Sequence, residues 1–196
     1  SMSGRFRFIK SATQLQECPS DPMPEIAVLG RSNAGKSSLV NAWTGSALAK
    51  ISAKPGKTRL INFFESKAYR LVDFPGYGYS ARSGDEQASW AGMIEPVLGA
   101  RENFRAALIL VDCRREVADE ERLLLNFLKH RGLPVAIVLT KVDKLNRSEA
   151  DKVKRASASI TGVDHVALVS SLKKTGLVEL EEFVFQSWIQ TSGSTR

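Results

Sequence analysis

The clearest chemical signal in the sequence is the segment Gly30 to Ser37, which reads GRSNAGKS. It matches the phosphate-binding loop pattern GxxxxGK[ST]. In such a loop the backbone N–H groups converge on phosphate oxygens, and the helix that follows adds partial positive charge. We expect Lys36 to reach the terminal phosphates and the Ser37 hydroxyl to ligate Mg²⁺. The predicted phosphate contacts are Gly30, Arg31, Ser32, Asn33, Ala34, Gly35, Lys36, Ser37 and Ser38.

A second signal is the segment Thr140 to Asp143, TKVD, which follows an apolar run. A carboxylate at Asp143 can accept hydrogen bonds from both N1–H and the exocyclic amine of guanine, a donor pair that adenine lacks. The stem of Lys141 could lie along the ring face. An Asp after a strand is also a common helix start, but downstream of a phosphate-binding loop the segment predicts guanine recognition. The predicted base contacts are Thr140, Lys141, Val142 and Asp143.

Two further segments complete the predicted nucleotide site. In DFPG, from Asp73 through Phe74 and Pro75 to Gly76, the aspartate could hold Mg²⁺ through water and the Gly76 N–H could meet the γ-phosphate. The segment Lys50 to Leu60 reads as a loop and offers the Thr58 hydroxyl as a second Mg²⁺ ligand. The contacts predicted there are Gly56, Lys57, Thr58, Arg59 and Leu60.

A third base-side loop is predicted at Val169, Ser170 and Ser171, although a serine N-cap would explain the same residues. The predicted metal ligands are Ser37, Thr58 and Asp73, and the residues assigned to catalysis are Lys36, Thr58 and Gly76. The chemistry they support is in-line attack of water on the γ-phosphate, with the lysine, Mg²⁺ and loop N–H groups neutralising the developing charge.

The elements that must position these residues alternate between apolar strands and amphipathic helices, which predicts an α/β fold. Four buried strands are expected at 25–29, 106–111, 135–140 and 165–169, and two more form a hairpin between Leu60 and Asp73. Helices are expected at 36–44, 87–98, 119–131, 148–159 and 176–190, the fourth with a capping box from Ser148 to Asp151. The prediction is a mostly parallel six-stranded sheet with one antiparallel edge strand and helices on both faces.

Length and composition limit the class of protein. A chain of 196 residues favours one domain, here 25–190, with an arm at 1–24 and a tail at 191–196; Ser1 before Met2 resembles a tag remnant. The net charge of +7 favours polyanionic partners. Cys18 and Cys113 are isolated, which predicts a reducing cytoplasm. No apolar run is long enough to span a membrane, and without heptads we expect a monomer.

The order GRSNAGKS, GKT, DFPG, TKVD and SSL resembles the five motifs of translation-factor-related (TRAFAC) GTPases, over roughly Glu25 to Gln190. Within that class, GRSNAGKSSLVNA, AKPGKTRLINFF and LVDFPGYGYS resemble the EngB (YihA/YsxC) family. The resemblance implies a small Mg²⁺-dependent GTPase that binds GTP and GDP and acts as a switch in large ribosomal subunit assembly. It also implies a need for the protein in cell division and septation.

The residue after DFPG departs from the Ras-like pattern. A glutamine there orients the attacking water in Ras-like enzymes, but this sequence has Tyr77, so we expect slow intrinsic hydrolysis that depends on another group or on a partner. Asn33 could help hold K⁺ against the phosphates, or it could simply brace the loop. Tyr77 and Tyr79 could stack on a partner or pack the switch.

The expected partner is ribosomal RNA in the large subunit. The region between Gly45 and Arg70 carries six cations against Glu65, and a basic arm precedes it. The cations of the region and the arm are Lys50, Lys54, Lys57, Arg59, Lys67 and Arg70, with Arg5, Arg7 and Lys10. Two alternatives stay open: a small P-loop kinase, for which no arginine-rich lid is evident, and a G-domain scaffold with negligible turnover.

Overall fold

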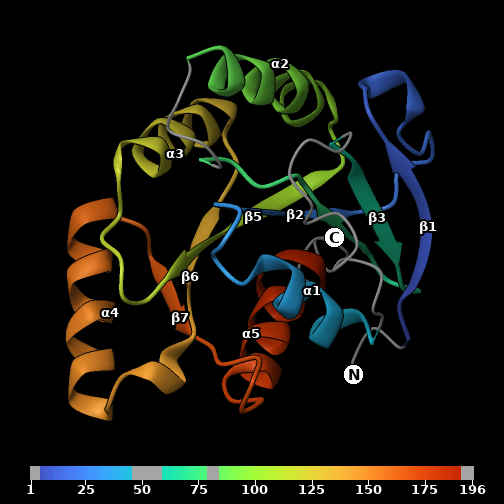
Figure 1. Ribbon diagram of the computed structural model, residues 1–196. Coiled ribbons are helices and arrows are strands. Elements are labelled where there is room, and N and C mark those ends of the chain that lie inside the picture. The colour runs from blue at the N-terminus through green and yellow to red at the C-terminus, as the bar shows by residue number, and fades with distance from the viewer. Residues whose placement is uncertain (1–4, 46–58, 79–83, 191–196) are drawn as a thin grey trace.

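The computed structural model describes residues 5–45, 59–78 and 84–190. In this part of the chain, seven strands form one sheet in the order β1-β3-β4-β2-β5-β6-β7 (Figure 1). The strands are β1 (Arg7–Ala12), β2 (Glu25–Gly30), β3 (Ile61–Glu65), β4 (Arg70–Asp73), β5 (Phe104–Asp112), β6 (Val135–Thr140) and β7 (His165–Leu168). No described helix has the length and apolarity that crossing a bilayer would require.

The sheet has one strand more than the six expected. The additional strand, β1, comes from the segment assigned to an N-terminal arm and pairs antiparallel with β3. It is held by aromatic contacts, since Phe8 meets Phe64 edge-on at 5.7 Å and Phe6 before it meets Tyr69 at 5.2 Å. Therefore β3, the antiparallel strand that the hairpin predicted, lies inside the sheet and β1 forms the edge.

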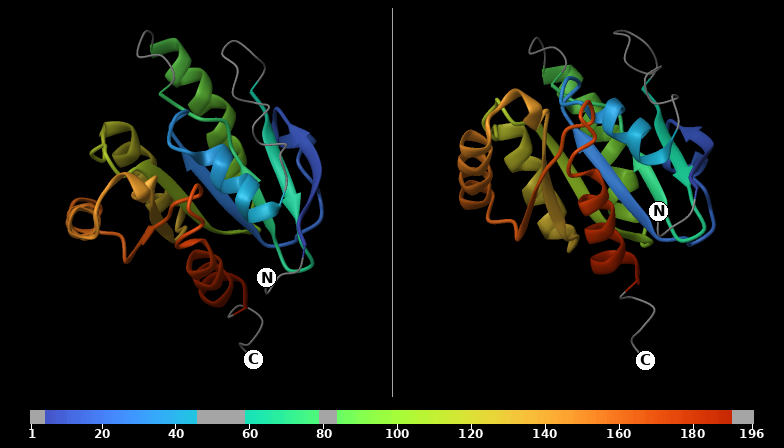
Figure 2. Two further views of the ribbon diagram at one scale, coloured as in Figure 1. Left: turned by 60° about the horizontal axis from the view of Figure 1, so that its bottom comes forward. Right: turned by 90° about the horizontal axis from the view of Figure 1, so that it is seen from below.

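Helices cover both faces of the sheet, as the α/β pattern predicts. The helices are α1 (Lys36–Thr44), α2 (Gly84–Ala100), α3 (Asp119–Arg131), α4 (Arg147–Thr161) and α5 (Leu177–Val184). One core contains side chains of α1 and α5, and the other contains side chains of α2 and α3. Figure 2 shows α1 and α5 on the same side of the sheet. The central strands β2, β5 and β6 lie between these two layers and are mostly apolar, as strands buried on both faces are.

The helix ends follow local capping chemistry, and several differ from the prediction. Helix α2 is longer at both ends than the expected 87–98, and α4 ends at Thr161 and not at 159. Helix α4 begins one residue earlier than expected, because its capping box is formed by Asn146 and Glu149 and not by Ser148 and Asp151. The last predicted helix changes character after Val184, where residues Phe185–Gln190 form a π-helix. Gly132 ends α3 in the left-handed conformation, as predicted.

An ionic network closes the end of the sheet that lies away from the predicted nucleotide loops. Glu25 is fully buried at the start of β2 and accepts hydrogen bonds from Arg70 at 3.0 Å and from Arg101 at 2.5 Å. Arg70 also pairs with Glu65 and with Asp21. These contacts bind the chain that leads into β2 to the body of the domain.

Candidate functional site

Four of the predicted motifs meet at one edge of the sheet. Strands β2, β4, β5, β6 and β7 run parallel, so their carboxyl ends lie at the same edge. The segments GRSNAGKS, DFPG, TKVD and SSL each follow one of these strands. In open α/β sheets the carboxyl edge is where ligands bind. The motifs that are far apart in the sequence are therefore assembled into one candidate site.

The phosphate-binding loop runs from the end of β2 to the first turn of α1. Gly35 is the N-cap of α1 and has a φ of 81°, a left-handed conformation that glycine adopts without strain. The Ala34 N–H donates to the Arg31 carbonyl at 3.0 Å, which closes the turn. Ser37 is half-buried in the first helical turn, where its hydroxyl lies beside the positive end of the helix dipole.

Lys36 and Asp73 form a buried ion pair between the phosphate-binding loop and the end of β4. Their side chains are 8% and 2% exposed, so the two charges neutralise each other in a site from which most water is excluded. Asp73 lies opposite Val28 of β2 in the sheet, which brings it to the start of the loop. The sequence predicted both residues at one site, and the structure places them in direct contact.

DFPG lies directly against the phosphate-binding loop. A Cβ atom on Gly76 would stand 2.7 Å from the Cα of Ser32, so only glycine permits this approach. The Ser32 N–H donates to the Tyr77 carbonyl at 3.0 Å, and the Tyr77 N–H donates to the Gly30 carbonyl at 3.2 Å. The two motifs are therefore joined through their backbones.

Tyr77 packs inward and not toward solvent. Its hydroxyl donates to Glu121 of α3 at 2.6 Å, and its ring meets Trp90 of α2 edge-on at 5.1 Å. Burial raises the pKa of Tyr77 well above its usual value, and the carboxylate of Glu121 raises it further. The Trp90 indole also donates to the Pro75 carbonyl at 2.6 Å. Of the two expected roles for Tyr77, the structure shows packing of the switch; Tyr79 lies outside the described residues.

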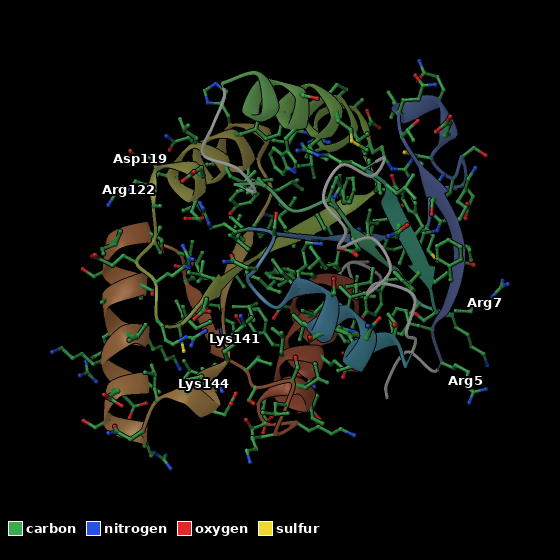
Figure 3. The ribbon with its side chains drawn as sticks, viewed as in Figure 1. Arg5, Arg7, Asp119, Arg122, Lys141 and Lys144 are labelled. Atoms are coloured by element: carbon green, nitrogen blue, oxygen red, sulfur yellow. The ribbon has the colours of Figure 1, made fainter. Side chains whose placement is uncertain are left out.

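The TKVD segment contacts both the phosphate-binding loop and the SSL loop. The Thr140 hydroxyl donates to the Ala34 carbonyl at 2.6 Å, and the Lys141 ammonium group donates to the Asn33 carbonyl at 2.9 Å. Asp143 accepts from the Ser170 hydroxyl at 2.7 Å, and this hydrogen bond lowers the pKa of the Asp143 carboxyl. Figure 3 shows Lys141 and Lys144 in the segment between β6 and α4. An ionised Asp143 is the form that can accept from guanine.

Ser170 forms the turn-capping contact that was the alternative interpretation of this loop, and the base-side role of the loop stays a prediction. Its hydroxyl also accepts from the Lys173 N–H at 3.0 Å, as a turn-capping serine does. The backbone of Val169 joins the same region, because its carbonyl accepts from the Val142 N–H at 3.3 Å. Ser171 is half-buried in the loop that follows.

The remaining predicted residues lie before β3, outside the described part of the chain, or away from the motif edge. Arg59 and Leu60 are half-buried immediately before β3, at the edge of the sheet that carries the motifs. Gly56, Lys57 and Thr58 lie outside the described residues. Ser38 is exposed on α1, and Phe74 is fully buried in the core behind Pro75.

Sequence reasoning missed the contribution of α3 to this site. Arg31 of the phosphate-binding loop pairs with Glu120 at 3.2 Å and donates to the Gly78 carbonyl at 3.3 Å. The neighbouring Glu121 accepts one hydrogen bond from the Tyr77 hydroxyl and another from the Ala118 N–H at 2.8 Å. Figure 3 labels Asp119 and Arg122 on the same first turn of α3. In the sequence, the acidic run DEE indicates only the start of a helix. No local pattern connects it to Arg31 and Tyr77, which are distant in the chain.

The donor set fits a magnesium ion. Mg²⁺ prefers oxygen ligands, and Ser37 and Asp73 bring a hydroxyl and a carboxylate to the same end of the loop. The buried ion pair with Lys36 shows that Asp73 is directed toward the phosphate-binding loop. These two residues would hold the ion, together with nucleotide oxygens and water.

Comparison with known proteins agrees with this arrangement. Residues 25–141 match the family described as "50S ribosome-binding GTPase". A "Probable GTP-binding protein EngB" of Bdellovibrio bacteriovorus is 47% identical over 195 residues, covering 97% of this chain and 96% of that protein. A protein of the same name from Caldanaerobacter subterraneus is 41% identical over 177 residues, covering 88% of this chain and 91% of its own length.

Solved structures show the same fold. A probable GTP-binding protein engB superimposes with a TM-score of 0.69 at 22% identity, over 83% of this chain and 97% of that one. Era of Aquifex aeolicus bound to GDP·AlF4⁻ gives a TM-score of 0.66 at 22% identity, over 86% of this chain and 57% of Era. Together the matches favour a GTPase over the P-loop kinase considered from the sequence. The chain belongs to the EngB family of translation-factor-related (TRAFAC) P-loop GTPases.

Proposed function

We propose that this GTPase is a nucleotide-controlled switch in the assembly of the large ribosomal subunit. The observation that carries the proposal is the direct backbone connection between the phosphate-binding loop and the segment after DFPG. A nucleotide that moves one of these segments must disturb the other, and with it the surface formed with α2 and α3. The match to a 50S ribosome-binding GTPase family supports the large subunit as the partner.

Within this function, separate groups of motif residues bind the phosphates and the base of GTP or GDP. Backbone N–H groups of the phosphate-binding loop and Lys36 hold the phosphates, and Thr140 to Asp143 with Val169 to Ser171 hold the base. Bound Mg²⁺ would supply positive charge to the phosphates, held by Ser37, Asp73 and Thr58. Gly76 would present its N–H to the γ-phosphate, so this contact depends on GTP being present, and the Thr58 hydroxyl is proposed as a second ligand of Mg²⁺.

Hydrolysis proceeds without a side chain in the place of the Ras-like glutamine, because Tyr77 is turned into the core. We infer slow intrinsic turnover that a partner or K⁺ accelerates. Asn33 is exposed within the phosphate-binding loop, and we propose that it holds K⁺ there. Comparing hydrolysis in potassium and sodium chloride at equal ionic strength tests this, and equal rates would remove the role of potassium.

The RNA-binding surface must differ from the basic region between Gly45 and Arg70 that the sequence favoured. Arg70 is 1% exposed and its guanidinium is occupied by Asp21, Glu25 and Glu65, so it cannot serve RNA. Lys67 is exposed, but it lies in the β3–β4 turn at the opposite end of the sheet from the motifs. Lys50, Lys54 and Lys57 lie outside the described residues.

The N-terminal cations remain available, and they support an RNA contact at the β1 edge. Arg5, Arg7 and Lys10 are all exposed, and the ion pair of Arg7 with Glu65 is long, at 3.8 Å. Figure 3 shows Arg5 and Arg7 on the β1 side of the molecule. Exposed cations at one sheet edge suit a phosphate backbone. The protein would act as a monomer in the cytoplasm, with residues 25–190 as the G domain and β1 added at the edge of its sheet, and its loss would impair septation.

Co-sedimentation with purified large ribosomal subunits tests the proposal directly. Binding should require a non-hydrolysable GTP analogue and weaken with salt, whereas GDP and nucleotide-free protein should bind less. The logarithm of the binding constant falls with the logarithm of the salt concentration, and the slope of this plot counts the neutralised phosphates. In the variant Arg7→Gln/Lys10→Gln the slope should become smaller by about one for each phosphate that is no longer neutralised. Lys152→Gln/Arg155→Gln, which removes two exposed cations from α4, is the matched control. Binding that ignores the nucleotide would refute the switch.

A further inference from the structure

Asp112 is a buried carboxylate for which the motifs provide no role. It ends β5, is 5% exposed and lies opposite Thr140 in the neighbouring strand β6. Because β5 lies between β2 and β6, this position stands between the phosphate-binding loop and the TKVD segment. A buried charge must be paired, so the partners of Asp112 indicate what it does.

Two cations share the carboxylate. Arg114 donates to Oδ1 from its backbone N–H and its Nε, both at 3.0 Å, and to Oδ2 from its guanidinium at 2.8 Å. The Lys141 ammonium group approaches Oδ2 at 3.3 Å. Hydrogen bonding by Arg114 holds the pKa of Asp112 well below its usual range, so the carboxylate is charged at neutral pH. The Arg114 side chain is half exposed, whereas the Lys141 side chain is less exposed and also contacts the phosphate-binding loop at Asn33.

Lys141 is held from three directions. Its ammonium group contacts Asp112 and donates to the Asn33 carbonyl at 2.9 Å, and its backbone carbonyl accepts from the Cys113 thiol at 3.3 Å. Its stem passes over the phosphate-binding loop, since its Cε lies 3.5 Å from where a Cβ on Gly35 would stand. Its φ of 62° is unfavourable for a residue with a side chain, so surrounding contacts must maintain it.

We propose that Asp112 is a positioning residue for guanine nucleotides, which holds the Lys141 side chain across the phosphate-binding loop in the place where the base ring packs. Without this anchor the lysine would have to be ordered when the nucleotide binds, and the cost of ordering would appear as lost affinity. The inference needs only guanine nucleotide binding, so it is independent of the ribosomal partner proposed above.

A double-mutant cycle on GDP affinity tests the inference. Asp112→Asn keeps the shape of the side chain but removes the charge, and it should raise the Kd for a fluorescent GDP analogue about tenfold, mainly through faster dissociation. In a Lys141→Met background the same substitution should change the Kd by less than about twofold, because its effect passes through the lysine. Arg115→Gln, an exposed neighbour, is the control and should leave the Kd unchanged.

Thermal unfolding of the nucleotide-free variants separates positioning from a purely structural effect. If Asp112→Asn does not fold, Asp112→Glu retains the charge and displaces the carboxylate, and it goes through the same cycle. An effect on the Kd that persists in full in the Lys141→Met background would overturn the inference. So would an Asp112→Asn variant that binds GDP as tightly as the original protein does.

Discussion

The hydrogen bond between Tyr77 and Glu121 allows a quantitative test of how the switch segment is held. Tyr77→Phe keeps the ring on Trp90 but leaves a buried carboxylate oxygen of Glu121 without its donor. A hydrogen bond to a charged group contributes about 1.5–3 kcal/mol, so we expect a loss of about 2 kcal/mol. For a domain of this size that corresponds to a fall in Tm of about 4–8 °C. Thermal unfolding monitored by circular dichroism measures it.

Hydrolysis provides the second half of this test. Because the Tyr77 hydroxyl is directed into α3, its removal should leave kcat for GTP hydrolysis within about threefold. Tyr69→Phe is the matched control, since Tyr69 is also buried and accepts a hydrogen bond from Trp43 at 3.1 Å in the opposite core. A Tm within 1 °C of the original, taken as about the error of the method, would show that the hydrogen bond contributes nothing. A loss of kcat above about tenfold would show that the hydroxyl takes part in the chemistry.

The pH dependence of the same pair has a defined sign. The pKa of Tyr77 is raised on folding, so the native state retains a proton that the unfolded chain loses above about pH 10. The stabilisation by Tyr77 is therefore complete below that pH and is lost as the pH rises. The difference in Tm between the original protein and Tyr77→Phe should shrink between about pH 9 and pH 11. A difference that stays constant would contradict the assigned pKa direction.

Three further substitutions test other contacts. Gly76→Ala should lower stability by about 1–3 kcal/mol and weaken GTP binding, because its Cβ would meet the backbone of Ser32; thermal unfolding and nucleotide titration measure both. Glu25→Gln should cost about 3–5 kcal/mol in chemical denaturation, since the buried Arg101 guanidinium loses its carboxylate partner and Arg70 loses one of the three carboxylates that it contacts. Asp143→Asn should raise the Kd for GDP more than tenfold, as about 1.5–3 kcal/mol per charged hydrogen bond implies, and leave nucleotide-free stability almost unchanged.

Much of the fold follows from local sequence signals. The bounds predicted for α1, α3 and β6 are those observed, because each is limited by a local signal such as a glycine, a proline or a polar cluster. The contact of DFPG with the phosphate-binding loop was also predictable, since parallel strands bring their carboxyl ends to one edge. β1 was missed because RFIKSA carries two cations and alternates weakly, and its place in the sheet depends on pairing with β3.

The chemistry of the protein can be predicted from short runs of consecutive residues, because the phosphate-binding loop, the predicted guanine contact Asp143 and the tyrosine in place of a glutamine after DFPG are all local features. Which charged side chains are exposed and which are paired in the interior depends on the folded arrangement of the strands and helices. Arg70 looked like part of a basic surface but is buried, Tyr77 pairs with a glutamate 44 residues away, and Asp112 reaches Lys141 through the pairing of β5 with β6. The reason is physical: the energy of a charge depends on its burial and its partners, and strand register sets both.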